Sequence, residues 1–387
     1  MAPVLSFPPR VAQATKLVYA RPHSIRRPST NCSEIMSRSD HPAAALEVAR
    51  RSFARALKAL GTLAAVGIFV AGCSGEDRGP SASQESRSVT VAMPLALHSA
   101  LVLLAVEKRY FAQHGLDVSI KPMASGAAAI DALERGQADF ALNSETAFVL
   151  AALAKKNVRV LATVYRSRAN MSMIARKDRG IVRPRDLAGK RIGVIPNTGA
   201  DYFADLYLGL QGIESDRITR VPLNVNQAER ALLDGNVDAV ALFYPYGPQL
   251  IARLGEQAVV FSDPAVYQMQ FNLVARQDFT VSRPTVARAF VAALQDALTF
   301  LQENPEVAKR LTIEATKEDP TAFGKVWQVS DFMLGLNQDL LSVFEDEARW
   351  AMTRSTTPHA AGPNALELID AGPLQGVRPD NVSILLP

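Results

Sequence analysis

Small polar side chains follow the apolar run "ADFAL" (138–142) at the point where a helical pattern begins. They are Asn143, Ser144, Glu145 and Thr146. Their hydroxyl, amide and carboxyl groups supply compact hydrogen-bond donors and acceptors for a small ligand. Glu145 would repel a plain inorganic anion, so it has two interpretations. It pairs with an ammonium group or the ring nitrogens of a ligand, or it stabilises the first turn of the following helix.

A second turn of this kind follows the apolar run "RIGVI" (191–195). Thr198 and Asp201 have the spacing of a capping box, in which the acid accepts a hydrogen bond from the backbone amide of the first residue. That geometry would leave the next two amides open to a ligand oxygen, and a glycine there lets the ligand approach closely. The residues predicted to line a site at this turn are Asn197, Thr198, Gly199 and Tyr202.

Three further segments place polar or aromatic side chains at comparable positions. His98 follows the first predicted strand and can donate to an anion, or it is a surface or capping histidine. Ser125 starts a helix as its N-cap, and the neighbouring amides can also face a ligand. Aromatic residues in "LFYPYGP" suit stacking on a ring or covering an alkyl chain, although Phe243 suits core packing as well. The ligand contacts predicted from these segments are His98, Ser99, Ser125, Phe243, Tyr244 and Tyr246.

Residue patterns typical of common enzyme and metal sites are missing after residue 72. The motifs G-x-S-x-G, H-E-x-x-H, C-x-x-C and G-x-x-x-x-G-K-[ST] do not occur there. His98, His114 and His359 are too far apart for metal-ligand spacing. An enzyme that consumes its own ligand would need a His and Cys constellation that we do not find. We therefore expect no catalytic residues, no metal and no cofactor.

Strand and helix patterns alternate after the first 87 residues. Strand patterns at 88–93, 116–120 and 138–143 are separated by helical patterns at 99–115 and 125–136. Each helical pattern ends at a glycine, which is a common helix stop. This alternation predicts a mostly parallel sheet flanked by helices.

The same order of elements restarts later in the chain. "ALERGQAD" (132–139) returns as "ALLDGNVD" (231–238), and "MIARKD" (173–178) returns as "LVARQD" (273–278). Two matches in the same order predict two similar lobes rather than a solenoid, whose repeats would be shorter. The strands that end in Ala-Arg are the predicted crossing points between the lobes.

The N-terminal region has the layout of a secretory signal. Basic residues at 50–58 precede the apolar run "ALGTLAAVGIFVA", which is too short for an untilted membrane span. The run ends in "VAGC", which resembles a lipobox, so Cys73 is the predicted lipidation site and new N-terminus. Met36 is an alternative start, and "RRSFAR" resembles the twin-arginine export motif as an alternative to the Sec route. The expected domains are a leader (1–72), a flexible tether (73–87), lobe 1 (88–170 and 272–387) and lobe 2 (171–271).

The formal charge of +4 does not describe the exported part of the chain. Residues 1–72 hold ten Lys/Arg and three Asp/Glu, which leaves 32 basic and 35 acidic residues in the remainder. A basic surface of the kind that binds nucleic acid therefore has no support there. Cys73 is the only cysteine of the mature chain, so a disulfide or a thiolate metal site within it is excluded.

Four segments together resemble the substrate-binding proteins of ATP-driven (ABC) importers, in the nitrate, sulfonate and taurine group that is related to thiamine-precursor binders. They are "EKRYFAQHGLDVSI", "ALERGQADFALNS", "RPRDLAGKRIGVIPNTGADYF" and "ALLDGNVDAVALFYPY". The resemblance implies an α/β, two-lobe periplasmic-binding-protein fold of type II, with a two-strand hinge. It also implies that the protein captures a ligand between the lobes and delivers it to a permease, without chemistry on the ligand.

The resemblance, taken with Glu145 and the aromatic residues, predicts a small anionic or zwitterionic ligand of the sulfonate or taurine kind. A thiamine-precursor-like pyrimidine is the alternative ligand, and an extracytoplasmic sensing module is the alternative function. The expected partners are the ligand, the permease and ATPase subunits and, through the lipid anchor, the membrane. We expect a monomer on the periplasmic side of the cell envelope.

Overall fold

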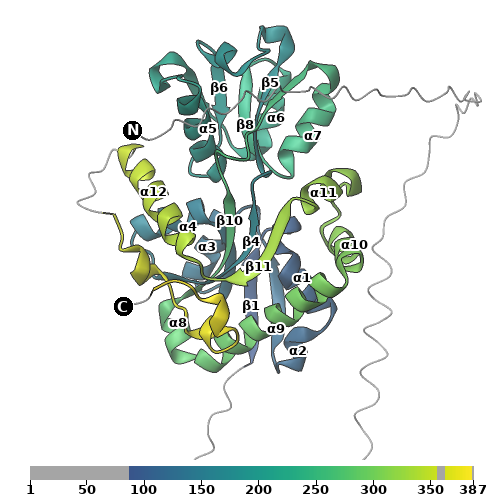
Figure 1. Ribbon diagram of the computed structural model, residues 1–387, viewed down its shortest axis with the longest axis vertical. Helices are drawn as coiled ribbons and strands as arrows, with labels where there is room; N and C mark the ends of the chain where they lie inside the picture. The colour runs from purple at the N-terminus through teal and green to yellow at the C-terminus, as the bar shows by residue number, and fades with distance from the viewer. Residues whose placement is uncertain (1–86, 355–361, 386–387) are drawn as a thin grey trace, which may run out of the picture. The chain divides into compact units, whose positions relative to one another are not determined.

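Figure 1 shows the computed structural model, which describes residues 87–354 and 362–385 of the chain. All of these residues lie in one compact unit, Pro80–Pro387. The predicted leader, the lipidation site Cys73 and residues 73–86 of the tether lie outside the described residues. Within the described ranges, no helix combines the length and apolar character needed to cross a membrane.

Six strands form the first sheet, in the order β11-β4-β10-β3-β1-β2. β1 pairs in parallel with β2 and β3. β10 pairs antiparallel with β3 and β4, and β11 pairs antiparallel with β4. The strands are β1 (Ser88–Met93), β2 (Asp117–Pro122), β3 (Phe140–Ser144), β4 (Val158–Ser167), β10 (Met269–Arg276) and β11 (Ser330–Gly335).

Helices from two separate parts of the chain, residues 100–153 and 277–375, flank this first sheet (Figure 1). α3 packs on β1 and β3, α1 and α2 pack on α9, and α12 packs on α4. The predicted helix over 99–115 is broken in two, because Arg109 has a left-handed φ of 58°. The helices are α1 (Ala100–Glu107), α2 (Tyr110–Gln113), α3 (Gly126–Glu134), α4 (Glu145–Leu153), α8 (Gln277–Ser282), α9 (Pro284–Glu303), α10 (Pro305–Thr316), α11 (Pro320–Trp327), α12 (Gln338–Arg354) and α13 (Gly372–Gln375).

Five strands form the second sheet, in the order β7-β6-β8-β5-β9. β6 pairs in parallel with β7 and β8, and β5 pairs antiparallel with β8 and β9. The strands are β5 (Met171–Arg176), β6 (Arg191–Val194), β7 (Thr219–Pro222), β8 (Ala239–Phe243) and β9 (Ala258–Phe261). The helices are α5 (Gly199–Leu210), α6 (Val225–Leu233) and α7 (Tyr246–Leu254).

Short 3₁₀ helices occur in several connections of both sheets. They are η1 (Leu97–Ser99), η2 (Lys177–Arg179), η3 (Pro184–Leu187), η4 (Ser215–Arg217), η5 (Gly255–Gln257), η6 (Ala365–Leu368) and η7 (Pro379–Asn381). η1 connects β1 to α1 and carries His98.

The chain passes between the two sheets twice. Residues 168–170 lead from β4 to β5, and residues 262–268 lead back from β9 to β10. The crossings therefore precede the two strands that end in Ala-Arg, instead of running along them. Both sheets are mixed rather than mostly parallel, because a strand that returns from the other sheet runs opposite to the strand that left. β10 shows this directly, since it pairs antiparallel with β4.

Candidate ligand-binding site

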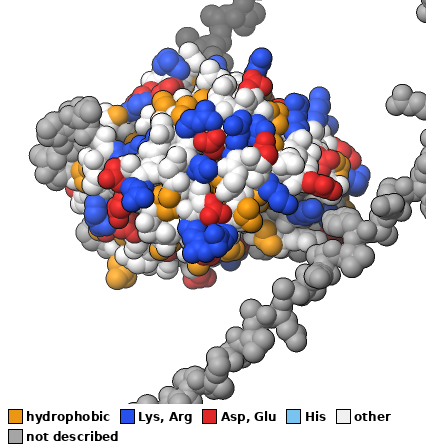
Figure 2. Space-filling view, turned by 90° about the horizontal axis from the view of Figure 1, so that it is seen from above, with side chains coloured by type: hydrophobic (Ala, Val, Ile, Leu, Met, Phe, Trp, Pro, Cys, Tyr) orange, Lys and Arg blue, Asp and Glu red, His pale blue; other side chains and the backbone are white. Residues whose placement is uncertain are grey.

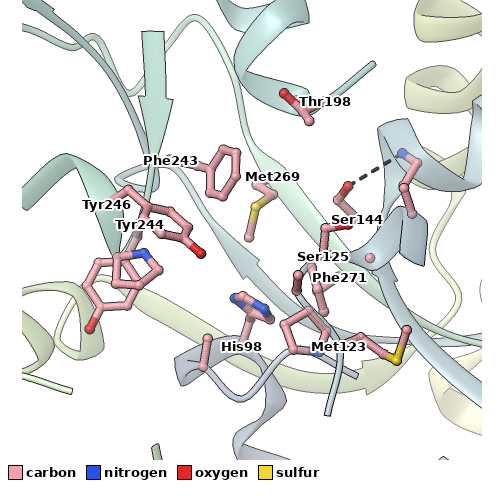
Figure 3. A pocket seen from close by; sticks show the side chains of 18 of the residues that line it. His98, Met123, Ser125, Ser144, Thr198, Phe243, Tyr244, Tyr246, Met269 and Phe271 are labelled. Carbon is pink, nitrogen blue, oxygen red and sulfur yellow. Dashed lines mark hydrogen bonds between the residues drawn. The ribbon is translucent and has the colours of Figure 1, made fainter. Parts of the chain in front are cut away.

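A cavity of about 370 Å³ is lined by residues from both sheets and their connections. η1 and the loops after β1 and β2 contribute from the first sheet, as do the starts of α3 and α4 and two residues of β10. β5, the start of α5 and the loop after β8 contribute from the second. Figure 3 shows Tyr244 and Tyr246 on one side of this cavity and Ser125 and Ser144 on the other, with His98 between them.

The structure brings nine of the fourteen predicted contact residues into the cavity wall. They are His98, Ser125, Ser144, Asn197, Thr198, Gly199, Phe243, Tyr244 and Tyr246. The other five do not line the cavity. They are Ser99, Asn143, Glu145, Thr146 and Tyr202.

Apolar residues that the sequence reading missed make up much of the wall. Met269 and Phe271 both face the cavity because alternate residues of β10 point to the same side. Met171 at the start of β5 and Met123 after β2 contribute thioether side chains. Met171 and Met269 each follow a crossing between the sheets directly, a position that the sequence prediction missed because it placed the crossings on the strands themselves.

None of the residues that line the cavity has a charged side chain at neutral pH. The lining holds no Asp, Glu, Lys or Arg. His98 is its one histidine, and burial lowers the pKa of this imidazole to about 3, so the ring is neutral. The wall therefore offers hydrogen bonds and apolar contact, but no counter-ion for a charged group.

His98 is held by aromatic packing rather than by hydrogen bonds. Its ring lies against Phe271 with centroids 3.8 Å apart and contacts the edge of Tyr165 at 6.2 Å. Neither ring nitrogen has a hydrogen-bond partner among the described residues. Because a buried polar group without a partner is costly, a ligand that hydrogen-bonds to this ring would remove that cost.

Three helices begin at the cavity, and each leaves backbone amides near it. Ser125 caps α3 by accepting from the Ala128 amide at 3.2 Å. Ser144 caps α4 by accepting from the Ala147 amide at 3.4 Å, the bond drawn in Figure 3. Thr198 makes no such cap for α5, because its hydroxyl donates to the Ile195 carbonyl at 2.7 Å. Helix N-termini attract negative charge through these amides. The cavity thus has anion-attracting helix ends but no cationic side chain.

Gly199 allows the start of α5 to reach the cavity. A Cβ at this position would lie 2.7 Å from the Tyr267 hydroxyl oxygen and 2.9 Å from the Met171 Cε. A larger residue would therefore have to displace the Tyr267 and Met171 side chains or the start of α5. The groups that approach this glycine closely in the structure are protein side chains.

The predicted capping box between Thr198 and Asp201 does not form. Asp201 accepts weakly from the Asn197 amide at 3.4 Å and forms an ion pair with Arg220, while Arg354 lies 3.6 Å away. Asn197 has a left-handed φ of 62°, which turns its own amide toward the acid. The carboxyl group was thus assigned the wrong partner, because Arg220 and Arg354 are distant in sequence.

Glu145 lies behind the cavity wall and is fully buried. Its Oε1 accepts from the Tyr267 hydroxyl, and its Oε2 accepts from the Gln270 amide at 2.9 Å. Burial raises the pKa of this carboxyl group to about 7, although both hydrogen bonds oppose the change. Both oxygens have protein partners, so the structure offers no position from which Glu145 contacts a ligand in this cavity.

Three of the four remaining residues outside the wall, Thr146, Ser99 and Tyr202, have structural contacts of their own. Thr146 donates to Oε1 of Glu347 at 3.1 Å, and both residues are buried. Ser99 donates to the Pro94 carbonyl at 2.7 Å. Tyr202 packs against Tyr267, and Asn143 is buried without a side-chain partner among the described residues.

No group of His, Cys, Asp and Glu that could hold a metal ion occurs among the described residues. On the face seen in Figure 2, basic and acidic side chains are interspersed with small apolar areas. That face therefore presents no extended surface of a single charge.

Comparisons with known proteins agree with this geometry. The family model described as "NMT1/THI5 like" matches residues 97–308. A Brucella abortus protein named only as a binding protein is 25% identical over 233 residues, which are 57% of this chain and 69% of that protein. A 4-amino-5-hydroxymethyl-2-methylpyrimidine phosphate synthase of Legionella pneumophila is 24% identical over 222 residues, 55% of this chain and 68% of the synthase.

The two sheets, the two crossings and the cavity are those of the periplasmic-binding-protein fold. The Escherichia coli periplasmic aliphatic sulphonate binding protein SsuA has this fold and is similar with a TM-score of 0.63 at 15% identity, covering 73% of this chain and 92% of that one. The family match spans more than half of the chain, so the chain belongs to the NMT1/THI5-like family. The family and fold inferred from the sequence resemblance are thus confirmed.

Proposed function

We propose that the chain is the extracytoplasmic solute-binding component of an ABC importer and that it captures a small organic anion of the sulfonate type. The observation that carries this proposal is an uncharged cavity where three helix N-termini meet aromatic and thioether side chains. Membership of the family and the fold shared with a sulphonate-binding protein support it. Delivery to a permease and its ATPase, the lipid anchor at Cys73, the periplasmic location and a monomeric state belong to the same proposal.

The anionic end of the ligand would face the starts of α3, α4 and α5. Backbone amides and the hydroxyl groups of Ser125 and Ser144 can bind an oxyanion without a cationic side chain. An ammonium group would find no carboxylate in the wall, because Glu145 is buried behind it. A sulfonate without an amine therefore fits the cavity better than taurine does.

The apolar end of the ligand would lie among Phe243, Tyr246, Met269 and Phe271. Such a wall favours an alkyl chain or an aromatic ring by burying its surface. Nitrate has no apolar part and would leave most of a cavity of about 370 Å³ unfilled. An organic anion is therefore preferred to an inorganic one.

A pyrimidine is the second candidate ligand. The free nitrogens of the His98 ring and its aromatic neighbour Phe271 suit a planar heterocycle with hydrogen-bonding edges. The likeness to a pyrimidine phosphate synthase points the same way. Binding rather than catalysis is proposed for either ligand, because the wall contains no Cys, Lys or carboxylate to act on it. An extracytoplasmic sensing module, the alternative function, would bind its ligand in the same cavity.

A thermal-shift screen of the purified protein tests this proposal. We expect benzenesulfonate or butanesulfonate to raise the melting temperature, because a ligand at a hundredfold excess over its Kd stabilises the folded state by about 2.7 kcal/mol. Taurine and nitrate should give smaller shifts. A shift with a pyrimidine alone would favour the second candidate, and no shift with any of these compounds would contradict the proposed ligand class.

Two variants connect a positive result to the cavity. Tyr246→Ala removes an aromatic wall residue, so we expect about tenfold weaker binding of benzenesulfonate in calorimetry. Tyr110→Ala, at a half-buried tyrosine of α2 outside the wall, is the matched control, and its affinity change should stay below about twofold. Equal loss in both variants would show that the affinity depends on general stability rather than on the wall.

A further inference from the structure

One hydrogen bond joins the two halves of the molecule at the cavity. Tyr244 follows β8 of the second sheet, lines the cavity and is 3% exposed. Its hydroxyl group donates to Oε2 of Glu318 at 2.6 Å. Glu318 lies between α10 and α11, beside the first sheet, and does not itself line the cavity. The carboxyl group therefore holds a wall residue that comes from the opposite sheet.

No cation among the described residues forms an ion pair with this carboxyl group. The groups that face it are the hydroxyl of Tyr244 and the amide of Leu97, with the Tyr165 hydroxyl further away. His98, which follows Leu97 in η1, is neutral because burial lowers its pKa to about 3. Lys317 and Asp319 flank Glu318 in the chain, but both are exposed.

Burial raises the pKa of Glu318 to about 7, and the hydrogen bond from Tyr244 and the nearby Leu97 amide only partly oppose this. Oε1 of the same carboxyl group is shielded from solvent. If the two halves separated about the crossings at 168–170 and 262–268, Tyr244 would withdraw and water would reach the carboxyl group. Its pKa would then fall toward the ordinary value of 4.5.

The pKa of Glu318 is higher when the two halves are closed than when they are apart, and this sets the direction of the pH effect. A group whose pKa is higher in the closed state binds its proton more tightly there. Closing between pH 4.5 and about 7 therefore takes up a proton, and closing becomes less favourable as the pH rises through this window. Above about pH 7 Glu318 is ionised in both states, so the free energy of closing changes little further with pH.

We propose that Glu318 is a positioning residue that holds Tyr244 in the cavity wall, and that capture of the ligand takes up a proton at this carboxyl group. The proposal rests on the proposed function, because it assumes that the ligand favours the closed arrangement of the two halves.

Calorimetry with benzenesulfonate as the probe tests the proton uptake. The titration is carried out at pH 6.5 in two buffers of different ionisation enthalpy and is repeated at pH 5 and pH 8. For the wild-type protein we expect net uptake of protons and at least about tenfold weaker binding at pH 8 than at pH 5. Wild-type affinity that is independent of pH, with no uptake, would overturn the proposal.

Variants at position 318 separate the proton from the positioning role. Glu318→Gln keeps an acceptor for Tyr244 and resembles the protonated acid, so it should match the wild type at pH 5, bind more tightly at pH 8 and take up no proton. Glu318→Ala should bind more weakly than the wild type at pH 5, because it loses the acceptor for Tyr244, and its affinity should not change with pH. Glu256→Gln, an exposed residue of η5, is the control and should behave as the wild type. Unchanged proton uptake in Glu318→Gln would assign it to another group, such as Glu145 or Glu347, and overturn the proposal.

A measurement without ligand distinguishes failure of this inference from failure of the proposed function. The radii of gyration of the ligand-free wild type and Glu318→Gln are compared at pH 5 and pH 8 by small-angle X-ray scattering. Because closing takes up the proton, we expect the wild type to be more compact at pH 5 than at pH 8 and the variant to be equally compact at both. If benzenesulfonate does not bind but this difference appears, the proposed ligand is wrong while the proton site at Glu318 stands. A radius of gyration that does not change with pH in the wild type, or that changes equally in the variant, would overturn the proton site whether or not the ligand binds.

Discussion

Helices α4 and α5 begin at corresponding places beside the two sheets, and each carries a buried acid in its first turn. Asp201 of α5 pairs with Arg220 of β7, and Arg354 of α12 lies nearby. Glu145 of α4 receives hydrogen bonds only from neutral donors, Tyr267 and Gln270. The acid in the first turn of the helix is thus paired with cations in one half of the molecule, and it is hydrogen-bonded by uncharged groups in the other half.

The two acids have different partners because they are buried to different depths and contact different parts of helix α12. The end of α12 brings Arg354 to Asp201 and Asp205, where solvent still reaches the guanidinium group, whose side chain is 36% exposed. The middle of α12 instead brings Glu347, a second buried acid, to the start of α4. Burial and the charge of Glu145 raise the pKa of Glu347, so this pair of acids favours the protonated form. For Asp201, burial also raises the pKa, and Arg220 and Arg354 oppose it.

Removing Asp201 should have the largest effect on stability. Asp201→Ala takes away one partner of the mostly buried Arg220, so we expect the free energy of unfolding to fall by about 4 kcal/mol in urea denaturation at pH 7. Asp216→Ala, which changes an exposed acid of η4, is the matched control and should lose less than about 0.5 kcal/mol. A loss below about 1 kcal/mol for Asp201→Ala would mean that Asp205 alone satisfies both arginines.

Replacing Glu145 should instead change how stability depends on pH. The pKa of Glu145 in the folded protein is about 7, above its ordinary value of 4.5, so the folded state binds this proton more tightly. Wild-type stability should therefore decrease as the pH rises from 4.5 to about 7 and then level off. Glu145→Gln lacks this loss, so relative to the wild type it should gain about 3 kcal/mol between pH 4.5 and pH 8.

Urea denaturation of both proteins across this pH range gives the measurement. Glu256→Gln, a change at an exposed position, should follow the wild type at every pH. If the curves of Glu145→Gln and the wild type ran parallel, Glu145 would be ionised in the folded protein. The contrast between the two helices would then disappear.

Arg354→Ala should have the smallest effect of the three. Its ion pairs are partly exposed, and its contact over the Trp350 ring, 5.4 Å from the centroid, is also near the surface. We expect a loss below about 1 kcal/mol in urea denaturation, reduced further in 1 M salt. A loss as large as that of Asp201→Ala would identify Arg354, rather than Arg220, as the main counter-ion of the acid.

The parts of the fold built from neighbouring segments were predictable from sequence. Alternating strand and helix patterns gave β1, α3 and β3, and the two repeats indicated a second, similar sheet. β10 was harder, because it pairs with β3 and β4, more than one hundred residues earlier in the chain. A local pattern cannot show which strand will be inserted between two others, so the mixed character of the sheets was missed.

The candidate site shows the same limit. The turns at Ser125, Ser144 and Thr198 were found because strand ends and helix starts gather at one edge of a sheet. Met269 and Phe271 carried no chemical signal, since apolar residues resemble core residues in sequence. Glu145 lies in the first turn of α4, as one of its two interpretations had it, but its partner Tyr267 is 122 positions away and could not be found by local reasoning.

Trp350 gives the molecule an internal optical reporter. Its indole N–H donates to Asp205 of α5 at 2.8 Å, although the residue itself belongs to α12, which packs on α4 beside the first sheet. The chain has one other tryptophan, Trp327, which is buried against Phe323 and Phe332 within the first half. Fluorescence from Trp350 in a Trp327→Phe background therefore follows the approach of one half to the other without an added dye.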